Sequence, residues 1–292
     1  MLGGAGSGLS LLQSVLHQHK YMQAAGLITT LTTLLDDTIH HTKNRKQFKL
    51  PLSDFPLVRQ KLGKMAGRLY CLESMVYFTA GLADASKDPD VDVESVIVKQ
   101  YAAETSDYIV SGCLELLGAQ VNLKTSKYQK YLRENQVLQG WQGSSNINKC
   151  FIGISGLMHL VNHEPELALI RQPANGNFLK SMRHKYNTWG NKMDRVSMSL
   201  DLAGCVRPGL QDSARSLEWC VHKVHFAAQD LLVKHGANIQ VEEHYLERLS
   251  DLVTEVYAVT CALSRASRSL SLGLENSMFE RNIVLPVVHD SK

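Results

Sequence analysis

The sequence predicts an all-α protein, in which a four-helix bundle is followed by a smaller helical domain. The 292 residues include only seven prolines, which fall between periodic segments and leave the long proline-free stretches that helices require. Apolar residues in those stretches recur every three or four positions, which is the period of an amphipathic helix. Strand signals are nearly absent, since β-branched runs such as IVLPVV at 283–288 are isolated and broken by a proline.

Four segments carry the helical period in the first part of the chain. Helices are predicted at residues 9–42, 55–86 and 93–117, and a partly helical stretch at 132–161 is broken in its first part by the loop at 138–149. Four long helices with short connections are typical of an antiparallel bundle. Residues 1–162 are therefore predicted to form one helical unit.

The character of the chain changes after residue 162. Residues 164–176 contain two prolines and indicate a connector, and residues 177–195 carry five Lys or Arg against one Asp. Two further helices are predicted at 212–235 and 241–272. The predicted organisation is thus a bundle at 1–162, a basic connector at 163–195 and a C-terminal helical domain at 196–292.

Composition excludes several classes of protein. With 44% apolar and 20% charged residues the chain can build a globular core, and a net charge of +3 is too small to indicate nucleic-acid binding. No apolar run is long enough for a membrane span, and the start resembles neither a secretory signal nor a mitochondrial presequence. We therefore expect any targeting signal to lie elsewhere, or the chain to be a fragment or short isoform. The six cysteines occur singly and the 12 histidines lack metal-ligand spacing, so no metal site is predicted.

Two stretches of the sequence resemble a known enzyme family. Residues 44–48 read NRKQF, and residues 53–78 follow as SDFPLVRQKLGKMAGRLYCLESMVYF. These stretches resemble the C-terminal helical domain of the acyl-CoA dehydrogenases. Residues 232–273, with LSRASRSL at 263–270, resemble the extra C-terminal region of the very-long-chain branch of that family. The resemblance implies FAD as cofactor, a homodimer, a mitochondrial location and fatty acyl-CoA substrates, and a full member would carry two further domains.

The resemblance also marks positions that would contact FAD. In the family, the Arg of the N-R-x-Q-F motif reaches the flavin pyrophosphate, and a guanidinium is a good bidentate partner for phosphate. At a helix end the same Arg would also complement the helix dipole. A second motif, Q-x-x-G-G-x-G, is degenerate here, because residues 115–121 read ELLGAQV. These changes predict that FAD binding is weak or absent. The ancestral FAD positions are Arg45, Gln47, Phe48, Gly118, Gly143 and Ser144.

The loop at 138–149, LQGWQGSSNINK, contains the position of the family's catalytic base. Its residues 141–146 align with F-E-G-T-N-D, in which the Glu removes a proton from the acyl-CoA. Gln142 takes that position, and a carboxamide can hold a hydrogen bond but cannot accept the proton. Some branches place the base on the first helix, where the matching residue is His19. An imidazole can act as a base, but a histidine beside Lys20 in a polar cluster is more typical of a solvated helix residue. No catalytic residue is therefore expected.

The basic connector suggests a surface for a membrane or a partner protein. Basic side chains interspersed with aromatic ones can lie on an anionic membrane, and in the resembling enzymes this region is associated with the inner membrane. The alternative is an exposed connector whose charges are merely solvated. The residues expected to make the contact are Lys180, Arg183, Lys185, Trp189 and Lys192.

From these features we expect a catalytically silent relative that acts as a scaffold in an assembly complex on the matrix face of the mitochondrial inner membrane. The very-long-chain branch includes an assembly factor for respiratory complex I. The resemblance therefore implies that role here, with ECSIT and a complex I intermediate-associated protein as the kind of partner. Two alternatives stay open: an FAD-dependent long- or very-long-chain acyl-CoA dehydrogenase of β-oxidation seen as a fragment, and a dimerising interaction module.

Overall fold

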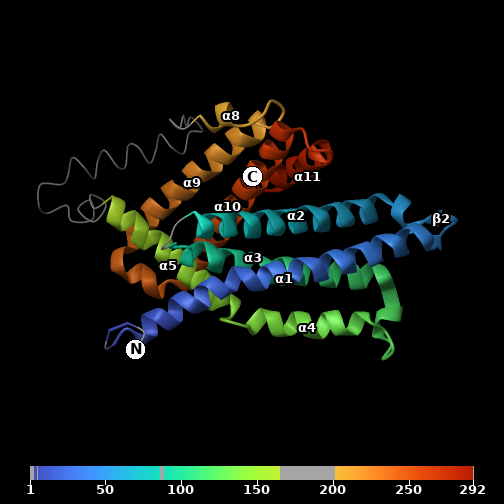
Figure 1. The fold of residues 1–292 in the computed structure, drawn as a ribbon, viewed down its shortest axis with the longest axis horizontal. Coiled ribbons are helices and arrows are strands. Elements are labelled where there is room, and N and C mark those ends of the chain that lie inside the picture. The colour runs from blue at the N-terminus through green and yellow to red at the C-terminus, as the bar shows by residue number, and fades with distance from the viewer. Residues whose placement is uncertain (1–2, 5, 86–88, 165–200, 292) are drawn as a thin grey trace, which may run out of the picture.

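A computed structural model describes residues 3–4, 6–85, 89–164 and 201–291, and every structural statement below refers to these residues. Helices dominate this part of the chain, and its only strands form one short hairpin (Figure 1). The predicted all-α class is confirmed. The longer helices are α1 (Gly8–Asn44), α2 (Pro56–Asp84), α3 (Asp92–Leu117), α4 (Tyr128–Gly140), α5 (Ser145–His163), α9 (Gln211–His235), α10 (Glu243–Leu272) and α11 (Ser277–Asp290).

Helices α1 to α4 lie side by side, with α1 packed along both α2 and α3 (Figure 1). The periodic apolar residues of the sequence face the neighbouring helices. Leu31 and Leu34 of α1 and Met65 and Leu72 of α2 are fully buried. Helix α3 contacts α1, α2, α4, α5 and α10. Because neighbours surround it, α3 is buried without interruption from residue 95 to residue 103. The predicted stretch 132–161 divides into α4 and α5, but the loop between them is residues 141–144 and not 138–149, because residues 138–140 end α4 and residues 145–149 begin α5.

The C-terminal helices pack directly on the bundle. Helix α10 lies against both α2 and α5, and α11 lies against α10 and α2. One cluster of buried apolar residues runs from Met65 of α2 through Ala262 of α10 to Val284 of α11. A unit boundary near residue 162 stays a prediction, and the buried core is continuous on both sides of it.

Arg265 of α10 links the C-terminal helices to α2. Its guanidinium donates a hydrogen bond to Glu73 of α2 at 2.8 Å and lies over the rings of Tyr70 and Tyr77, 4.8 and 5.4 Å from their centroids. The hydroxyl of Tyr70 in turn donates to Glu280 of α11 at 3.1 Å. The stretch 263–270, which carried the resemblance, thus places an arginine that links three helices.

One prediction from the sequence, for residues 283–288, is wrong. Residues 283–288 looked like an isolated β-branched run, but they lie within α11, with Pro286 inside the helix. A proline there removes a main-chain hydrogen bond, which disfavours the helix. Val284 and Val288, one helical turn apart, are both buried. Burial on one face therefore outweighs the local preference.

Two further features bear on membrane contact. Among the described helices, none combines the length and the apolar character needed to cross a bilayer. The expected contact residues Lys180, Arg183, Lys185, Trp189 and Lys192 lie outside the described residues.

Candidate functional site

The loop singled out in the sequence joins α4 to α5 through residues 141–144. Gln142 and Gly143 have φ angles of 55° and 106°, so the chain passes through the left-handed region at both positions. Glycine adopts this region freely, whereas a glutamine rarely does. Ser144 then precedes the first residue of α5 and is exposed. The loop therefore has a defined, costly shape that neighbouring groups must hold.

Two buried side chains bind the carbonyl oxygen of Gly143. Lys99 Nζ of α3 donates to it at 2.7 Å, and Asn148 Nδ2 of α5 donates to it at 3.0 Å. Asn148 Oδ1 accepts a hydrogen bond from Lys20 Nζ of α1 at 3.3 Å. All three side chains are more than nine-tenths buried. The loop is thus fixed from α1, α3 and α5 at once.

The two lysines are buried close to one another. Burial and, to a smaller extent, the charge of Lys20 together lower the pKa of Lys99 to about 8. Burial also lowers the pKa of Lys20, and Asp92 opposes that shift. Neither lysine nor Asn148 is among the site residues expected from the sequence. A usable signal was present, because Lys99 and Gln100 form a polar pair inside the otherwise apolar stretch 96–103.

The lowered pKa of Lys99 predicts a rise in stability at alkaline pH. An unfolded lysine keeps its proton to about pH 10.4, whereas folded Lys99 releases it near pH 8. Between these values the unfolded chain binds more protons, so the free energy of unfolding increases with pH. We expect an increase on the order of 1–2 kcal/mol from pH 8 to pH 10, after allowing for solvent screening.

Urea unfolding at several pH values would measure this rise. Lys99→Met should flatten the curve, while Lys64→Met, which changes an exposed lysine of α2, should leave it intact. An identical slope in wild type and Lys99→Met would contradict the assignment. Above pH 10 the buried Tyr70 and the partly buried Tyr257 act in the opposite direction, because desolvation raises the pKa of both.

Gln142 is half-buried, and its carboxamide oxygen has no hydrogen-bond partner among the described residues. A buried polar oxygen left without a partner costs about 1–3 kcal/mol. His19, the alternative base position, is exposed on α1. Successive residues of a helix are about 100° apart, and the next residue, Lys20, is the one that reaches toward the loop. The roles of Gln142 and His19 in catalysis stay predictions.

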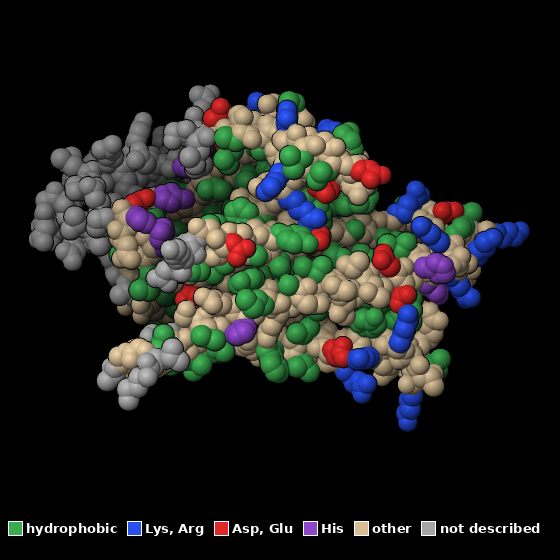
Figure 2. Space-filling model, in the orientation of Figure 1, with side chains coloured by type: hydrophobic (Ala, Val, Ile, Leu, Met, Phe, Trp, Pro, Cys, Tyr) green, Lys and Arg blue, Asp and Glu red, His purple; other side chains and the backbone are tan. Residues whose placement is uncertain are grey.

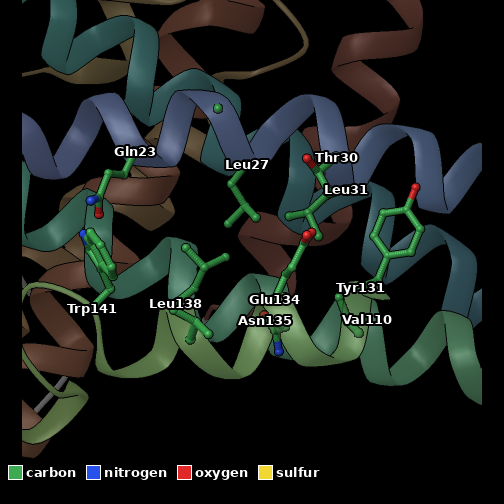
Figure 3. Close-up of a pocket in the computed structure, with 12 residues that line it drawn as sticks. Gln23, Leu27, Thr30, Leu31, Val110, Tyr131, Glu134, Asn135, Leu138 and Trp141 are labelled. Carbon is green, nitrogen blue, oxygen red and sulfur yellow. The ribbon is translucent and has the colours of Figure 1, made fainter. Parts of the chain in front are cut away.

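A groove of about 420 Å³ runs between α1 and α4 beside the loop (Figure 3). Gln23, Leu27 and Thr30 enter it from α1, and Leu138 enters from α4, with Trp141 at one end. The lining is mostly apolar, with a few polar groups. This size and character suit an elongated small molecule.

The N-R-x-Q-F residues lie at the other end of α1. Arg45 follows the last residue of α1, and strands β1 (Lys46–Gln47) and β2 (Leu50–Pro51) form a hairpin beyond it. Phe48 and Lys49 make the turn, with φ angles of 51° and 69°. A two-residue turn with both φ angles positive matches the twist of paired strands but normally uses Asn-Gly. Arg45, Gln47 and Phe48 are all exposed.

The degenerate glycine motif spans the last turn of α3 and the short helix η2 (Gly118–Asn122) that follows it. Gly118 has a φ of 76°, which explains why a glycine is kept there. Val121 is buried and its φ angle is not positive, so its β-branched side chain causes no left-handed backbone strain there. Glu115 forms an ion pair with Lys61.

The expected FAD positions do not come together within one chain. Lys20 marks the loop end of α1 and Arg45 its hairpin end, and 25 residues of helix span about 38 Å. Arg45, Gln47 and Phe48 are therefore far from Gly143 and Ser144. Within the described part of the chain, the hairpin set and the loop set of expected FAD positions are therefore separate, and a role for either in binding FAD stays a prediction. Among the described residues no group of three or more His, Cys, Asp or Glu side chains could hold a metal ion.

Known protein families match two stretches of the chain. Residues 6–156 match the acyl-CoA dehydrogenase C-terminal domain, and residues 208–291 match the ACAD9/ACADV C-terminal domain. The mitochondrial very long-chain specific acyl-CoA dehydrogenases of Mus musculus and Homo sapiens are 27% and 26% identical over 96% of this chain. The chain spans 42% and 43% of their lengths, which is less than half of each.

Solved structures share the fold. An acyl-CoA dehydrogenase from Bacillus anthracis, crystallised with FAD, superposes with a TM-score of 0.80 at 19% identity, covering 99% of this chain and 49% of that protein. Caenorhabditis elegans ACDH-11, crystallised with C11-CoA, gives a TM-score of 0.68 at 18% identity, covering 98% of this chain and 44% of that protein. At these identities the likeness concerns the arrangement of helices alone.

Proposed function

Because the chain belongs to the acyl-CoA dehydrogenase family, we propose that it is a member in which dehydrogenation is silent and the helical scaffold serves protein contacts instead. One observation carries the proposal: Gln142 occupies the position where the family resemblance puts the catalytic carboxylate. The loop around it keeps a specific left-handed shape, held by Lys99 and Asn148. The scaffold of the site is thus maintained without a group that can take the proton.

The chemistry of the side chain supports silence. Proton removal needs a base whose pKa lies near the working pH, and a carboxamide oxygen is far too weakly basic. Losing a general base typically slows a reaction by about 10²–10⁴-fold. The exposed position of His19 gives it no fixed orientation toward the loop.

The placement of the expected FAD residues supports a homodimer with weak or no flavin. The hairpin set and the loop set lie at opposite ends of α1, so a second copy would have to supply one of them. Two of the three glycines of the motif, which would let the backbone approach FAD, are replaced in this chain, by Ala119 and Val121. Measuring the FAD content of the purified protein therefore tests directly whether the family's flavin site is retained.

The groove beside Trp141 partly supports the alternative that the protein is an acyl-CoA dehydrogenase. An apolar channel of about 420 Å³ next to the loop is the right kind of space for a fatty acyl chain. Its retention is compatible with an acyl-binding protein that does no chemistry, and with an active acyl-CoA dehydrogenase of which this chain is one part. Turnover separates the two.

The enzymatic test uses the purified protein incubated with FAD, a long-chain acyl-CoA and an artificial electron acceptor. We expect no dye reduction above the background rate. Gln142→Glu restores the carboxylate, and where flavin is bound it should raise the rate by about 10²–10⁴-fold. Gln142→Asn is the matched control and should stay silent. Turnover by the unmodified protein at the rate of the Gln142→Glu variant would refute the proposal.

We further propose that the protein acts in a mitochondrial inner-membrane assembly complex, with complex I as the assembly target. Support comes from the match of residues 208–291 to the ACAD9/ACADV domain and from relatives named as mitochondrial enzymes. Affinity purification of the tagged protein from mitochondria should recover complex I assembly factors. Recovery of β-oxidation enzymes in their place would favour the enzymatic alternative, and recovery of a full-length relative alone would favour the dimerising module.

A further inference from the structure

The C-terminal helices line a cavity that takes no part in the site described above. Its volume is about 290 Å³, and α9, α10 and α11 each contribute to its lining. On the face drawn in Figure 2, hydrophobic side chains show between α9 and the bundle below it. Leu217, Val259 and Val288, one from each of the three helices, line the cavity and are buried members of the main apolar cluster. The cavity is therefore a space within the packed core of a single chain.

The size of the cavity limits what it can hold. Protein interiors contain few voids larger than a water molecule, so an apolar space of this volume forgoes packing contacts unless a ligand fills it. Since one water molecule takes about 30 Å³ of the liquid, the cavity suits a ligand of roughly ten non-hydrogen atoms. Trp219 and Leu252, which are 37% and 48% exposed, also line it, so the cavity opens to solvent.

Glu255 of α10 supplies the only carboxylate in the lining. Its side chain is half-buried, and it makes no hydrogen bond or ion pair within the described part of the chain. Burial raises the pKa of Glu255, and the charge of Arg68 opposes that shift. Arg68 itself lies over the ring of Tyr108, 4.7 Å from its centroid. A partly desolvated carboxylate of this kind is stabilised by a cation at hydrogen-bond distance.

The cation in the lining is already engaged. Lys223 of α9 lines the cavity, and its Nζ lies 5.3 Å from the centroid of the Trp219 ring. The face of an indole ring stabilises a cation placed over it. An acidic ligand would have to draw Lys223 from that ring and would meet the charge of Glu255 in the same space. The lining therefore favours a cationic ligand over an anionic one.

We propose that this cavity binds a small lipophilic amine, with its ammonium group on Glu255 and its apolar body against Leu217, Val259 and Val288. The homodimer proposed above brings together the two ends of α1, whereas α10 and α11 pack on α2 (Figure 1). The cavity is thus separate from that contact and from the groove beside Trp141. The inference does not depend on whether dehydrogenation is silent.

Isothermal titration calorimetry of the full chain with octylamine tests the proposal. We expect saturable binding of octylamine. Octanol and octanoate, which keep the alkyl chain but replace the cation by a neutral group and by an anion, should bind at least about tenfold more weakly. Either of them binding as tightly as octylamine would overturn the proposal, and so would a lack of saturable octylamine binding.

Two variants place the amine in the cavity. Glu255→Gln should weaken octylamine binding by about ten- to hundredfold, because it removes a charge-assisted hydrogen bond. Ala227→Leu adds apolar volume to the lining from α9 and should abolish binding without lowering the midpoint of urea unfolding. Glu255→Gln tests the same site with little change in volume, should Ala227→Leu fail to fold. Unchanged binding by Glu255→Gln would overturn the proposal.

Two matched controls separate the cavity from its competitors. Glu134 lines the groove between α1 and α4, and Glu243 is an exposed residue of α10 outside the cavity. Glu134→Gln and Glu243→Gln should each leave octylamine binding unchanged. Loss of binding in Glu134→Gln but not in Glu255→Gln would place the amine in the groove. Equal loss in Glu243→Gln and Glu255→Gln would reduce the effect to net charge, and either result would refute the assignment.

Discussion

Gly153→Val is expected to lower the free energy of unfolding by about 3 kcal/mol, at the upper end of what overpacking costs. Gly153 lies where α5 crosses α10, and the two backbones nearly touch. A Cβ atom placed on Gly153 would lie 2.9 Å from the carbonyl oxygen of Leu246 and 3.2 Å from its Cα. Because the obstacle is main chain, a rotamer change cannot relieve it, and the two helices must separate.

Gly156→Val is the matched control for this experiment. Gly156 lies one turn later on the same helix, is exposed, and a Cβ atom there would meet nothing within 4 Å. Its substitution should change stability by less than about 0.5 kcal/mol. Urea unfolding followed by far-ultraviolet circular dichroism would compare the two. Similar losses in both variants would mean that helix propensity, not the close approach of α5 and α10, explains Gly153.

Arg265→Ala is expected to cost about 2 kcal/mol, because it removes a partly buried ion pair and two cation–π contacts together. About 30% of the side chain of each ion-pair partner is exposed, so solvent screening keeps the loss below that of a fully buried pair. Arg265→Lys should recover little of it, since an ammonium lacks the flat face that stacks on Tyr70 and Tyr77. Hydrogen exchange should show reduced protection in α10 and α11 in particular.

Arg268→Ala gives the comparison within the same sequence motif. Arg268 lies three residues further along α10 and is exposed. Its loss should fall within about 0.5 kcal/mol of wild type. If both arginines proved equally dispensable, the link that Arg265 makes between α2 and α10 would contribute nothing measurable to the joint.

The contacts at Gly153 and Arg265 both join the C-terminal helices to the bundle. Gly153 brings α5 against α10, and Arg265 ties α10 to α2, so the C-terminal helices rest on the bundle through specific contacts. Lys149 adds a third contact, lying 3.1 Å from Glu104 of α3 and 2.7 Å from Asp251 of α10. These contacts join α10 to α2, α3 and α5, so the C-terminal helices and the bundle are packed together in the described part of the chain.

Most of the helices could be predicted from the sequence, because apolar periodicity is a local property. Predicted segments at 55–86, 93–117 and 212–235 agree with α2, α3 and α9 within a few residues. Helix α11 could not be predicted, since its proline and β-branched residues argue locally against a helix. Only the burial of Val284 and Val288 against the rest of the core outweighs that preference.

The sequence by itself determined the helical class, the family and the carboxamide at position 142, because each of these follows from residue identity and spacing along the chain. Tertiary structure alone decided which groups hold the loop: Lys20, Lys99 and Asn148 are 128 residues apart at the extremes and meet only after folding. It also decided that the expected flavin positions lie at opposite ends of α1. The physical reason is that hydrogen bonds and burial act through space, and spacing along one helix gives no information about which residues of other helices lie beside it.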